Sequence, residues 1–247
     1  MQINVPVRKA LVLAAGNGDR FVNGSRESKL LQPVLGEPLI LRTLRTAVEA
    51  GITQFEVVLG YRADTLRELL TVRPPSGATI NFSFNPEWHL ENGVSALAAR
   101  RHLADGPFAL LMGDHLFEAD ALAHLLRVPI SPIESALGID TRLAPPDLVD
   151  EATKVRTDGS HIVAIGKSLE RFDALDTGMF VCSPTLFDAL ERSRADGDTT
   201  LSGGVRLLAS ERRVLGVPVG DADWHDIDTM ADLQIAESRL HVLPESA

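Results

Sequence analysis

A short segment near the start of the chain has the residue types of a phosphate-binding turn. Residues 10–14 are apolar and typical of a strand, and the next residues include Gly16 and Gly18. Two glycines allow the backbone to turn sharply and bring its N–H groups close to an anion. Arg20 can fork onto two phosphate oxygens, and Lys29 supplies a mobile point charge. The segment therefore predicts a site for a phosphate chain.

Two other phosphate-binding motifs fail at particular residues of this segment. A dinucleotide-binding turn requires a third glycine where Phe21 stands, and it requires an acidic residue at the end of the next strand, where the chain has Gly60-Tyr61-Arg62. The phosphate loop of ATPases closes with Gly-Lys-Ser or Gly-Lys-Thr, which the segment lacks. A strand that ends in a flexible glycine turn without a function stays open as an alternative.

Three aspartates have the chemistry and the spacing of a magnesium site. Asp114 follows the apolar run 108–112, so we expect its carboxylate at the end of a buried strand. Asp226 and Asp228 are two residues apart, and in an extended segment their side chains point the same way. Mg²⁺ needs two or three hard oxygen ligands when substrate phosphates supply the rest. Asp114 alone could equally be a turn residue, and the other pair could belong to the start of a helix that Thr229 caps.

Polar residues between positions 85 and 95 could bind a nucleobase. Asn85, Asn92 and Ser95 supply amides and a hydroxyl, which can match the hydrogen-bonding edge of a pyrimidine. Ala14 and Ala15 would lie beside them, with no obvious aromatic platform for a purine, so we expect CTP, with UTP as the harder competitor to exclude. Asn and Ser at a helix start are also common caps, and that structural role is equally open.

Two histidines stand beside these aspartates in the sequence. His115 follows Asp114, and His225 precedes Asp226. We expect them to support the carboxylates rather than to bind metal or act as bases, because a phosphate monoester has a second pKa of about 6 and needs no base to attack at neutral pH. No Gly-x-Ser-x-Gly turn and no hydrolase triad presents itself in the sequence.

The composition is that of an ordinary globular protein. The 247 residues are 45% hydrophobic, and the formal net charge of −10 argues against nucleic acid or an anionic membrane as a partner. Cys182 is the only cysteine, which excludes an intrachain disulfide and a cysteine-rich zinc site. No apolar run approaches the roughly 18 residues of a membrane span, and no signal peptide is recognisable. We expect a cytoplasmic enzyme, for which the sequence allows a homodimer without requiring one.

Apolar strands and amphipathic helices alternate along the chain. We predict strands at residues 10–14, 54–59, 78–84, 108–112, 135–140, 154–156, 162–166 and 176–182. We predict helices at residues 38–50, 63–70, 92–103, 184–194 and 230–240. This order predicts an α/β fold with a mostly parallel mixed sheet and helices on both faces, in which ligands bind at the carboxyl ends of the strands.

The segment from Leu13 to Arg20, with Lys29 downstream, resembles the L-A-A-G-x-G-x-R and lysine signature of nucleotidyltransferases, which join a nucleoside monophosphate to a phosphorylated acceptor. From Leu11 to about Asp232, further motifs follow in the order typical of the inositol-1-phosphate cytidylyltransferase group of this family. They are Met112-Gly113-Asp114-His115, Glu151-Ala152-Thr153-Lys154-Val155, Ile165-Gly166-Lys167, Asp176-Thr177-Gly178 and Trp224-x-Asp226-x-Asp228-Thr229.

The resemblance implies a Rossmann-like three-layer sandwich and a Mg²⁺-dependent transfer of CMP from CTP, with release of pyrophosphate. It implies one domain over residues 1–247, with a nucleotide-binding half at about 9–128 and an acceptor-binding half at about 129–232. The nucleotide would contact Leu13, Ala14, Ala15, Gly16, Asn17, Gly18, Asn85, Asn92, Gly93 and Ser95. The catalytic cations would be Arg20, Lys29, Lys154 and Lys167, and the metal ligands would be Asp114 with Asp226 or Asp228. The acceptor would contact Glu151, Lys154, Asp176, Thr177 and Gly178.

The chain departs from the family pattern in two ways. The lysine motif, often Lys-Pro, is Lys29-Leu30 here, which keeps the cation but changes the rigidity of its loop. Some relatives carry a fused membrane alcohol-transferase domain, which these residues do not include, and similar enzymes act on phosphocholine, other polyol phosphates and phosphonates. The acceptor, a small phosphorylated or phosphonate compound, therefore stays open. A sugar-1-phosphate uridylyltransferase and a nucleotide sensor on the same fold are the alternatives, and the carboxylates argue against the sensor.

Overall fold

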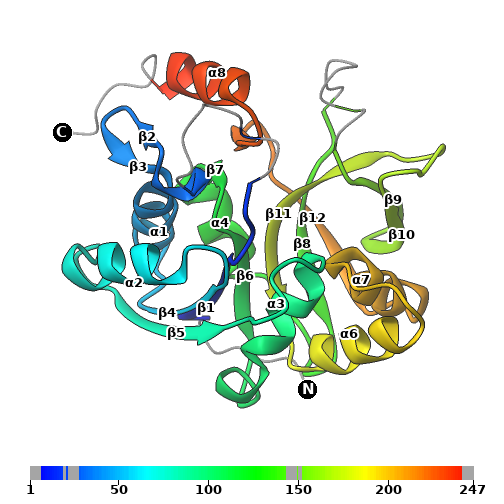
Figure 1. Cartoon of the computed structure of the whole chain (residues 1–247). Coiled ribbons are helices and arrows are strands. Elements are labelled where there is room, and N and C mark those ends of the chain that lie inside the picture. Colours follow the sequence, from blue (N-terminus) through cyan, green and yellow to red (C-terminus); the bar gives the residue numbers. More distant parts are fainter. Residues whose placement is uncertain (1–6, 19–20, 22–27, 143–148, 150–151, 241–247) are drawn as a thin grey trace.

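A nine-stranded sheet forms the centre of the protein in the computed structural model, which describes residues 7–18, 21, 28–142, 149 and 152–240 (Figure 1). Its strand order is β5-β4-β1-β6-β11-β8-β12-β10-β9. On one side of the sheet, four strands are parallel to their neighbours. They are β1 (Lys9–Ala14), β4 (Gln54–Leu59), β5 (Thr79–Phe84) and β6 (Phe108–Met112). Parallel strands covered on both faces are built from continuous apolar runs, as β1, β4 and β6 are, and the carboxyl ends of all four point the same way.

The other side of the sheet is mostly antiparallel. β11 (Ala174–Cys182) joins the two sides, because it pairs antiparallel with β6 and with β8 (Ser135–Asp140). β12 (Val214–Pro218) is parallel to β8. A hairpin of β9 (Lys154–Asp158) and β10 (His161–Gly166) forms the far edge. The predicted α/β fold with a mixed sheet is confirmed, and its parallel pairing is concentrated in the first half of the chain.

Helices cover both faces of this sheet and complete the three layers (Figure 1). One face carries α1 (Leu39–Glu49), α2 (Ala63–Val72) and α4 (Ala119–Leu125), and the other carries α3 (Asn92–Ala98), α6 (Thr185–Ala195) and α7 (Leu201–Ser210). β1 contributes to both cores, since successive side chains of a strand point to opposite faces. Ala10, Val12 and Ala14 belong to the first core, and Leu11 and Leu13 belong to the second.

Two short strands outside the main sheet carry His115 and Asp226. β7 (His115–Phe117) and β13 (Trp224–Asp226) pair antiparallel, with Asp226 opposite His115. Helix α8 (Met230–Leu240) follows β13 and lies at the top of Figure 1. Thr229 caps it as predicted, because the Asp232 N–H donates to Thr229 Oγ1 (3.2 Å) and the Thr229 N–H donates to Asp232 Oδ2 (2.7 Å).

The remaining elements are short. They are the 3₁₀ turns Lys29–Leu31 and Arg100–His102 and the ribbon of β2 (Pro33–Val34) and β3 (Glu37–Pro38). The helix predicted over residues 92–103 ends as an α-helix at Ala98 and continues after Ala99 as the second 3₁₀ turn. Within the described ranges, every helix is too short or too polar to cross a membrane.

Candidate active site

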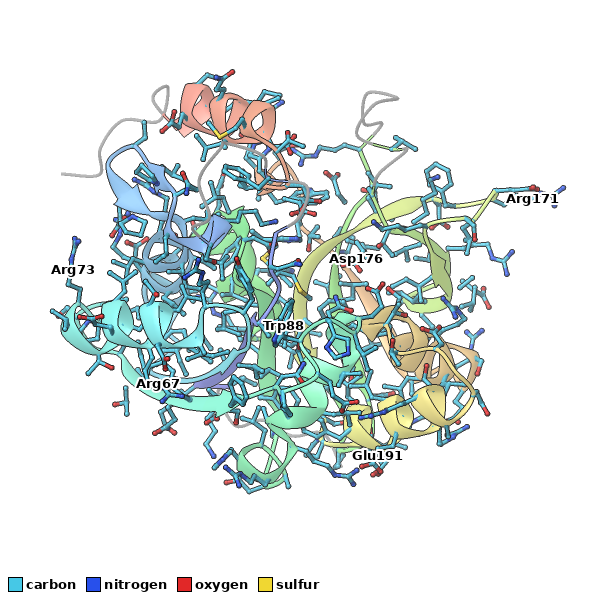
Figure 2. All side chains as sticks on the ribbon, in the orientation of Figure 1. Arg67, Arg73, Trp88, Arg171, Asp176 and Glu191 are labelled. Carbon is cyan, nitrogen blue, oxygen red and sulfur yellow. The ribbon has the colours of Figure 1, made fainter. Side chains whose placement is uncertain are left out.

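A cleft of about 580 Å³ opens at the carboxyl ends of β1 and β6. It brings together the glycine loop, the buried lysine after it, two aspartates and the segment that contains Trp88. Trp88 is labelled near the centre of Figure 2. Its lining residues are Leu13, Ala14, Ala15, Gly16, Asn17, Gly18, Lys29, Leu30, Trp88, His89, Leu90, Glu91, Asn92, Ser95, Met112, Asp114 and Asp228. Much of the predicted nucleotide-binding set therefore lies on one concave surface.

Lys29 is buried between two aspartates at this cleft. Its Nζ lies 2.8 Å from Asp114 Oδ2 and 2.8 Å from Asp228 Oδ1, although its side chain is only 8% exposed. Burial alone would lower the pKa of Lys29, but the two carboxylates raise it well above its ordinary value, so the lysine carries a charge. Gly18 has a φ of +65°, and a Cβ there would be 3.0 Å from Lys29 Cβ. Glycine at this position therefore lets the loop approach the lysine closely.

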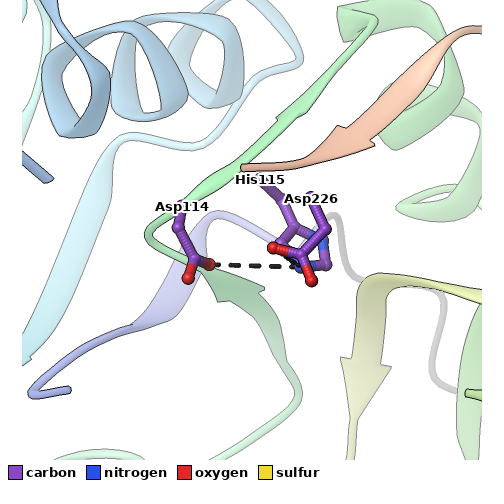
Figure 3. A group of neighbouring side chains, drawn as sticks. All are labelled: Asp114, His115 and Asp226. Carbon is purple, nitrogen blue, oxygen red and sulfur yellow. Dashed lines mark ion pairs between the residues drawn. The ribbon is translucent and has the colours of Figure 1, made fainter. Parts of the chain in front are cut away.

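Three side chains near this lysine have atoms suited to a divalent cation. Asp114, His115 and Asp226 each offer a ligand atom, and these atoms lie within 4.8 Å of one another (Figure 3). The backbone keeps the two acids together, because the Ile227 N–H donates to Asp114 O (3.2 Å). Carboxylate oxygens beside an open cleft are the donor set that Mg²⁺ uses when substrate phosphates complete its coordination. The carboxylate oxygens of Asp114 and Asp226 therefore fit Mg²⁺.

His115 lies against these carboxylates and is itself fixed by the main chain. Its Nδ1 is 3.1 Å from the carbonyl oxygen of Thr177, which can only accept, so Nδ1 carries a proton. Its Nε2 is 3.5 Å from Asp226 Oδ1 and 4.0 Å from Asp114 Oδ1. Burial alone would lower the pKa of His115, but Asp226 and then Asp114 raise it to about 9. Asp226 and Asp114 therefore favour the protonated ring, which has no lone pair for a metal ion, so the two carboxylates are the metal-ligand candidates of this group.

His225 lies in a different environment from His115. It follows Trp224 on β13, its Nε2 is 3.4 Å from Arg239 Nη1, and burial lowers its pKa. Its contacts join α8 to β13 and do not reach the carboxylate group around Asp114.

On the nucleobase side, Asn85 is placed differently from our expectation. It is 1% exposed, and its Nδ2 donates to Ser95 Oγ (2.9 Å) while its Oδ1 accepts from the Glu87 N–H (2.9 Å). Both ends of the amide are therefore used within the protein, and Asn85 is not among the residues that line the cleft. The contact of this amide with the base stays a prediction, and in the structure the amide orients the Ser95 hydroxyl at the wall of the cleft.

Asn92 and Gly93 attach the same wall to the acceptor half of the chain. Asn92 lines the cleft, and its Oδ1 accepts from the Leu201 N–H (2.8 Å) at the start of α7. A Cβ on Gly93 would be 2.6 Å from Thr199 O and 2.7 Å from Thr200 O. Glycine is therefore required there for close backbone packing, a different reason from the contact with the nucleotide that we expected.

Trp88 supplies the aromatic surface that the sequence analysis did not anticipate. It lines the cleft and packs against Tyr61, with ring centroids 5.4 Å apart. A Cβ on Gly60 would be 2.5 Å from Trp88 Cβ and 2.8 Å from Ala15 O, so this glycine lets the Trp88 segment pack closely on the end of β1. The signal was the tryptophan itself, between the predicted base-binding residues Asn85 and Asn92.

Among the described residues predicted for the acceptor, Lys154 lies on β9, Asp176, Thr177 and Gly178 lie on β11, and none of them lines the cleft; Lys167 follows directly after β10. Lys154 Nζ donates to Lys167 O (3.2 Å) and lies 5.6 Å from the centre of the Phe172 ring. Lys154 also pairs with Leu175 of β11, so it lies beside the residue that precedes Asp176 in the sheet. Burial raises the pKa of Asp176 to about 6.

Thr177 and Gly178, which we predicted to contact the acceptor, make contacts within the protein. Thr177 is fully buried, and its hydroxyl donates to Gly138 O (2.8 Å), so the predicted contact of Thr177 with the acceptor would have to come from its backbone and stays a prediction. Gly178 packs against the ring of His115. Arg20 and Glu151, which the sequence analysis also named, lie outside the described residues.

The fold is that of the nucleotidyltransferases. Residues 10–132 match the family model of the MobA-like NTP transferase domain, so this part of the chain belongs to that family. The solved structure of the inositol-1-phosphate CTP transferase from T. maritima superposes with a TM-score of 0.84 and 26% sequence identity, covering 99% of this chain and 100% of that one.

Two further proteins are similar to this chain in sequence. The bifunctional IPC transferase and DIPP synthase of Rubrobacter xylanophilus is 36% identical over 238 residues, 92% of this chain. The CMP-5'-(3-aminopropyl)phosphonate synthase of Streptomyces rubellomurinus is 29% identical over 253 residues, 95% of this chain. The chain spans 51% of the length of the first relative and 39% of the second.

Proposed function

We propose that this protein transfers CMP from CTP to the phosphoryl or phosphonyl group of a small acceptor and releases pyrophosphate. The observation that carries the proposal is the position of Lys29, held by Asp114 and Asp228 in a cleft that the glycine loop also lines. A buried cation, hard acidic ligands and a backbone turn are the parts that phosphoryl-group transfer requires. The relatives named for CTP transfer and for a CMP-phosphonate indicate the donor and the kind of acceptor.

The glycine loop and Lys29 are proposed to hold the triphosphate. Gly16, Asn17 and Gly18 line the cleft beside the lysine, so backbone N–H groups and one ammonium can act on the same phosphate chain. Lys29 would stabilise the negative charge that moves from the α-phosphate towards the departing pyrophosphate. Arg20 would add a bidentate contact to the same group.

Asp114, with Asp226 or Asp228, would hold a divalent cation, which we propose to be Mg²⁺ and which would neutralise charge on the phosphates when bound. A protonated His115 would reduce the repulsion between the carboxylates of Asp114 and Asp226.

The reaction itself is an in-line displacement at phosphorus. An oxygen of the acceptor phosphate or phosphonate forms a bond to the α-phosphorus, and the bond from that phosphorus to the oxygen bridging the α- and β-phosphates breaks. The acceptor is already largely a dianion at neutral pH, so no side chain has to remove a proton. Positioning and charge stabilisation therefore account for catalysis, with Lys154 and Lys167 proposed to attract the acceptor.

Ser95 and the backbone beside Ala14 and Ala15 are proposed to recognise the cytosine base, with Asn85 fixing the direction of the Ser95 hydroxyl. Trp88 would pack against the base from the open side of the cleft. The donor would be a cytoplasmic nucleotide, and we propose the cytoplasm as the place of the reaction.

With one good acceptor, we expect kcat/KM for CTP to exceed that for ATP and GTP by about 10² or more, because a site that hydrogen-bonds one base edge leaves its own groups unpaired with another base. Steady-state pyrophosphate release with the four nucleotides, against inositol 1-phosphate, phosphocholine and 3-aminopropylphosphonate, measures this preference. Preference for a purine nucleotide would contradict the pyrimidine site, and preference for UTP would indicate a uridylyltransferase.

A further inference from the structure

We propose that His115 is a positioning residue, which holds the acceptor-side turn of β11 at a fixed place relative to the carboxylates of Asp114 and Asp226. This inference rests on the proposed function for its kinetic consequence, but its structural part can be tested without a substrate. We define the acceptor turn as Asp176, Thr177 and Gly178.

The acceptor turn leaves the regular ladder of the sheet. Between the pairs Asp176–Ile139 and Phe180–Leu137, β11 has three residues where β8 has only Gly138. Such a bulge frees backbone groups from the ladder and redirects them, often beside a functional site. The carboxylate of Asp176 accepts from the Gly178 N–H (2.8 Å), which closes a local turn. The turn leaves the Thr177 carbonyl oxygen 3.1 Å from His115 Nδ1.

Gly178 makes this contact specific to the ring of His115. Its φ is +76°, in the left-handed region where side chains are rarely found, and a Cβ would be 2.3 Å from Nδ1 and 2.5 Å from Cε1 of the ring. The imidazole therefore packs directly on the backbone of the turn. Glycine at position 178 and histidine at position 115 fit each other.

The opposite nitrogen of the ring faces the acidic group. Nε2 lies 3.5 Å from Asp226 Oδ1 and 4.0 Å from Asp114 Oδ1, and Asp226 is the residue paired with His115 between β13 and β7 (Figure 3). The main chain of His115 is also fixed, because Thr43 Oγ1 donates to its carbonyl oxygen (3.0 Å). One imidazole ring thus spans the distance between the acceptor turn and the carboxylates.

This arrangement has a consequence for the reaction. In-line attack requires the acceptor oxygen and the α-phosphorus to meet within a narrow range of distance, and small displacements of a positioning group can lower a rate by about 10². If the acceptor turn is held through Nδ1 and the carboxylates through Nε2, the two contacts of the ring should have separable effects.

Two substitutions separate the contacts of the two nitrogens. The amide nitrogen of an asparagine can take the place of Nδ1, and that of a glutamine can take the place of Nε2. H115N should therefore keep the contact with Thr177 O and lose the contact with Asp226, whereas H115Q should do the reverse. G178A should resemble H115Q, because its methyl group would displace the ring from the turn. His225→Asn is the matched control, since His225 is also on the β7–β13 ribbon but contacts Arg239.

The first measurement is amide hydrogen exchange in the peptide that contains the acceptor turn, in the full-length protein without substrate. We expect the exchange rate to rise about tenfold in H115Q and G178A, because each loses one hydrogen bond. In H115N and His225→Asn we expect the rate to change less than twofold. Equal increases in H115N and H115Q, or no increase in either, would overturn the tether between His115 and the turn.

The second measurement is steady-state kinetics with CTP and inositol 1-phosphate. We expect H115Q to raise the KM for the acceptor about tenfold with a smaller change in kcat, and we expect H115N to lower kcat about tenfold with little change in that KM. A uniform loss in both variants would mean a merely structural role and would contradict the proposal. A wild-type protein that turns over no acceptor would instead contradict the proposed function, and the exchange result would still decide the role of His115.

Discussion

Replacing Lys29 with alanine should lower kcat by about 10²–10³, the scale of losing one preorganised group that stabilises charge in the transition state. Lys29 is charged and nearly buried, and it lies between Asp114 and Asp228 at the cleft. A mobile surface lysine would be screened by water, but a buried one acts in a low-dielectric site where its interaction with phosphate is stronger. Initial rates with saturating CTP, acceptor and Mg²⁺, together with the thermal unfolding midpoint, measure the effect.

Lys9 provides the matched control for this experiment. It forms an ion pair with Asp105 at 2.9 Å, but both side chains are exposed, at 36% and 72%. Exposed pairs of this kind contribute between about 0 and 1 kcal/mol to stability, so Lys9→Ala should leave both kcat and folding nearly unchanged. A Lys29→Ala protein that is folded and retains near wild-type kcat would remove Lys29 from the proposed mechanism.

Asp114→Asn should reduce kcat by about 10³ while the fold survives. The substitution keeps the shape of the side chain and removes its charge, so it weakens both the ion pair with Lys29 and the proposed ligand set for Mg²⁺. Asp114 follows β6 at the edge of the cleft, and its backbone contacts with Ile227 do not depend on the carboxylate. The rate as a function of Mg²⁺ concentration and the far-ultraviolet circular dichroism spectrum should be measured for the same preparation.

The corresponding control is Asp105→Asn, an exposed carboxylate that pairs with Lys9 far from the cleft. It removes the same charge and should leave the rate and its Mg²⁺ dependence unchanged. If Asp114→Asn also keeps full activity and the wild-type Mg²⁺ dependence, Asp114 is only a residue at the end of a strand.

The first half of the fold could be predicted because its signals are local. Residues 10–14, 54–59 and 108–112 are short apolar runs, and such runs favour strands buried on both faces. The cap of α8 was also predictable, because Thr229 and Asp232 stand three residues apart. Glycines and acids at predicted strand ends similarly indicated that the glycine loop and Asp114 would lie at the same edge of the sheet, and both line the cleft.

The second half of the fold contains elements that are stabilised by contacts between residues far apart in the sequence. Helix α7 includes Gly203 and Gly204, which lower intrinsic helix propensity. A Cβ on Gly204 would be 2.6 Å from Leu190 Cδ2, so the close packing of α6 on α7 requires this glycine. Tertiary packing therefore outweighs local propensity, and neither α7 nor the strand β12 that follows it was among our sequence predictions.

Several site residues likewise have hydrogen-bond partners that the sequence did not predict. The partner of the Asn92 side chain is the Leu201 N–H, more than a hundred residues away, and the partner of the Thr177 hydroxyl is Gly138 O. A sequence shows that these side chains are polar, but it does not show which distant backbone groups will satisfy them. The partners of the Asn85 amide are nearer, with Ser95 ten residues and the Glu87 N–H two residues away, but the sequence alone does not show that they bind it.

The most direct test of the account is identification of the products by ³¹P NMR, after the protein is incubated with CTP, Mg²⁺ and either inositol 1-phosphate or 3-aminopropylphosphonate. The account predicts one pyrophosphate for each CTP consumed and a coupled pair of new resonances, from a CMP unit joined through oxygen to the acceptor phosphorus. Both should depend on the acceptor and should fall about 10²–10³ in rate in Lys29→Ala. Release of CDP and inorganic phosphate, or of CMP and pyrophosphate at the same rate with and without an acceptor, would contradict it.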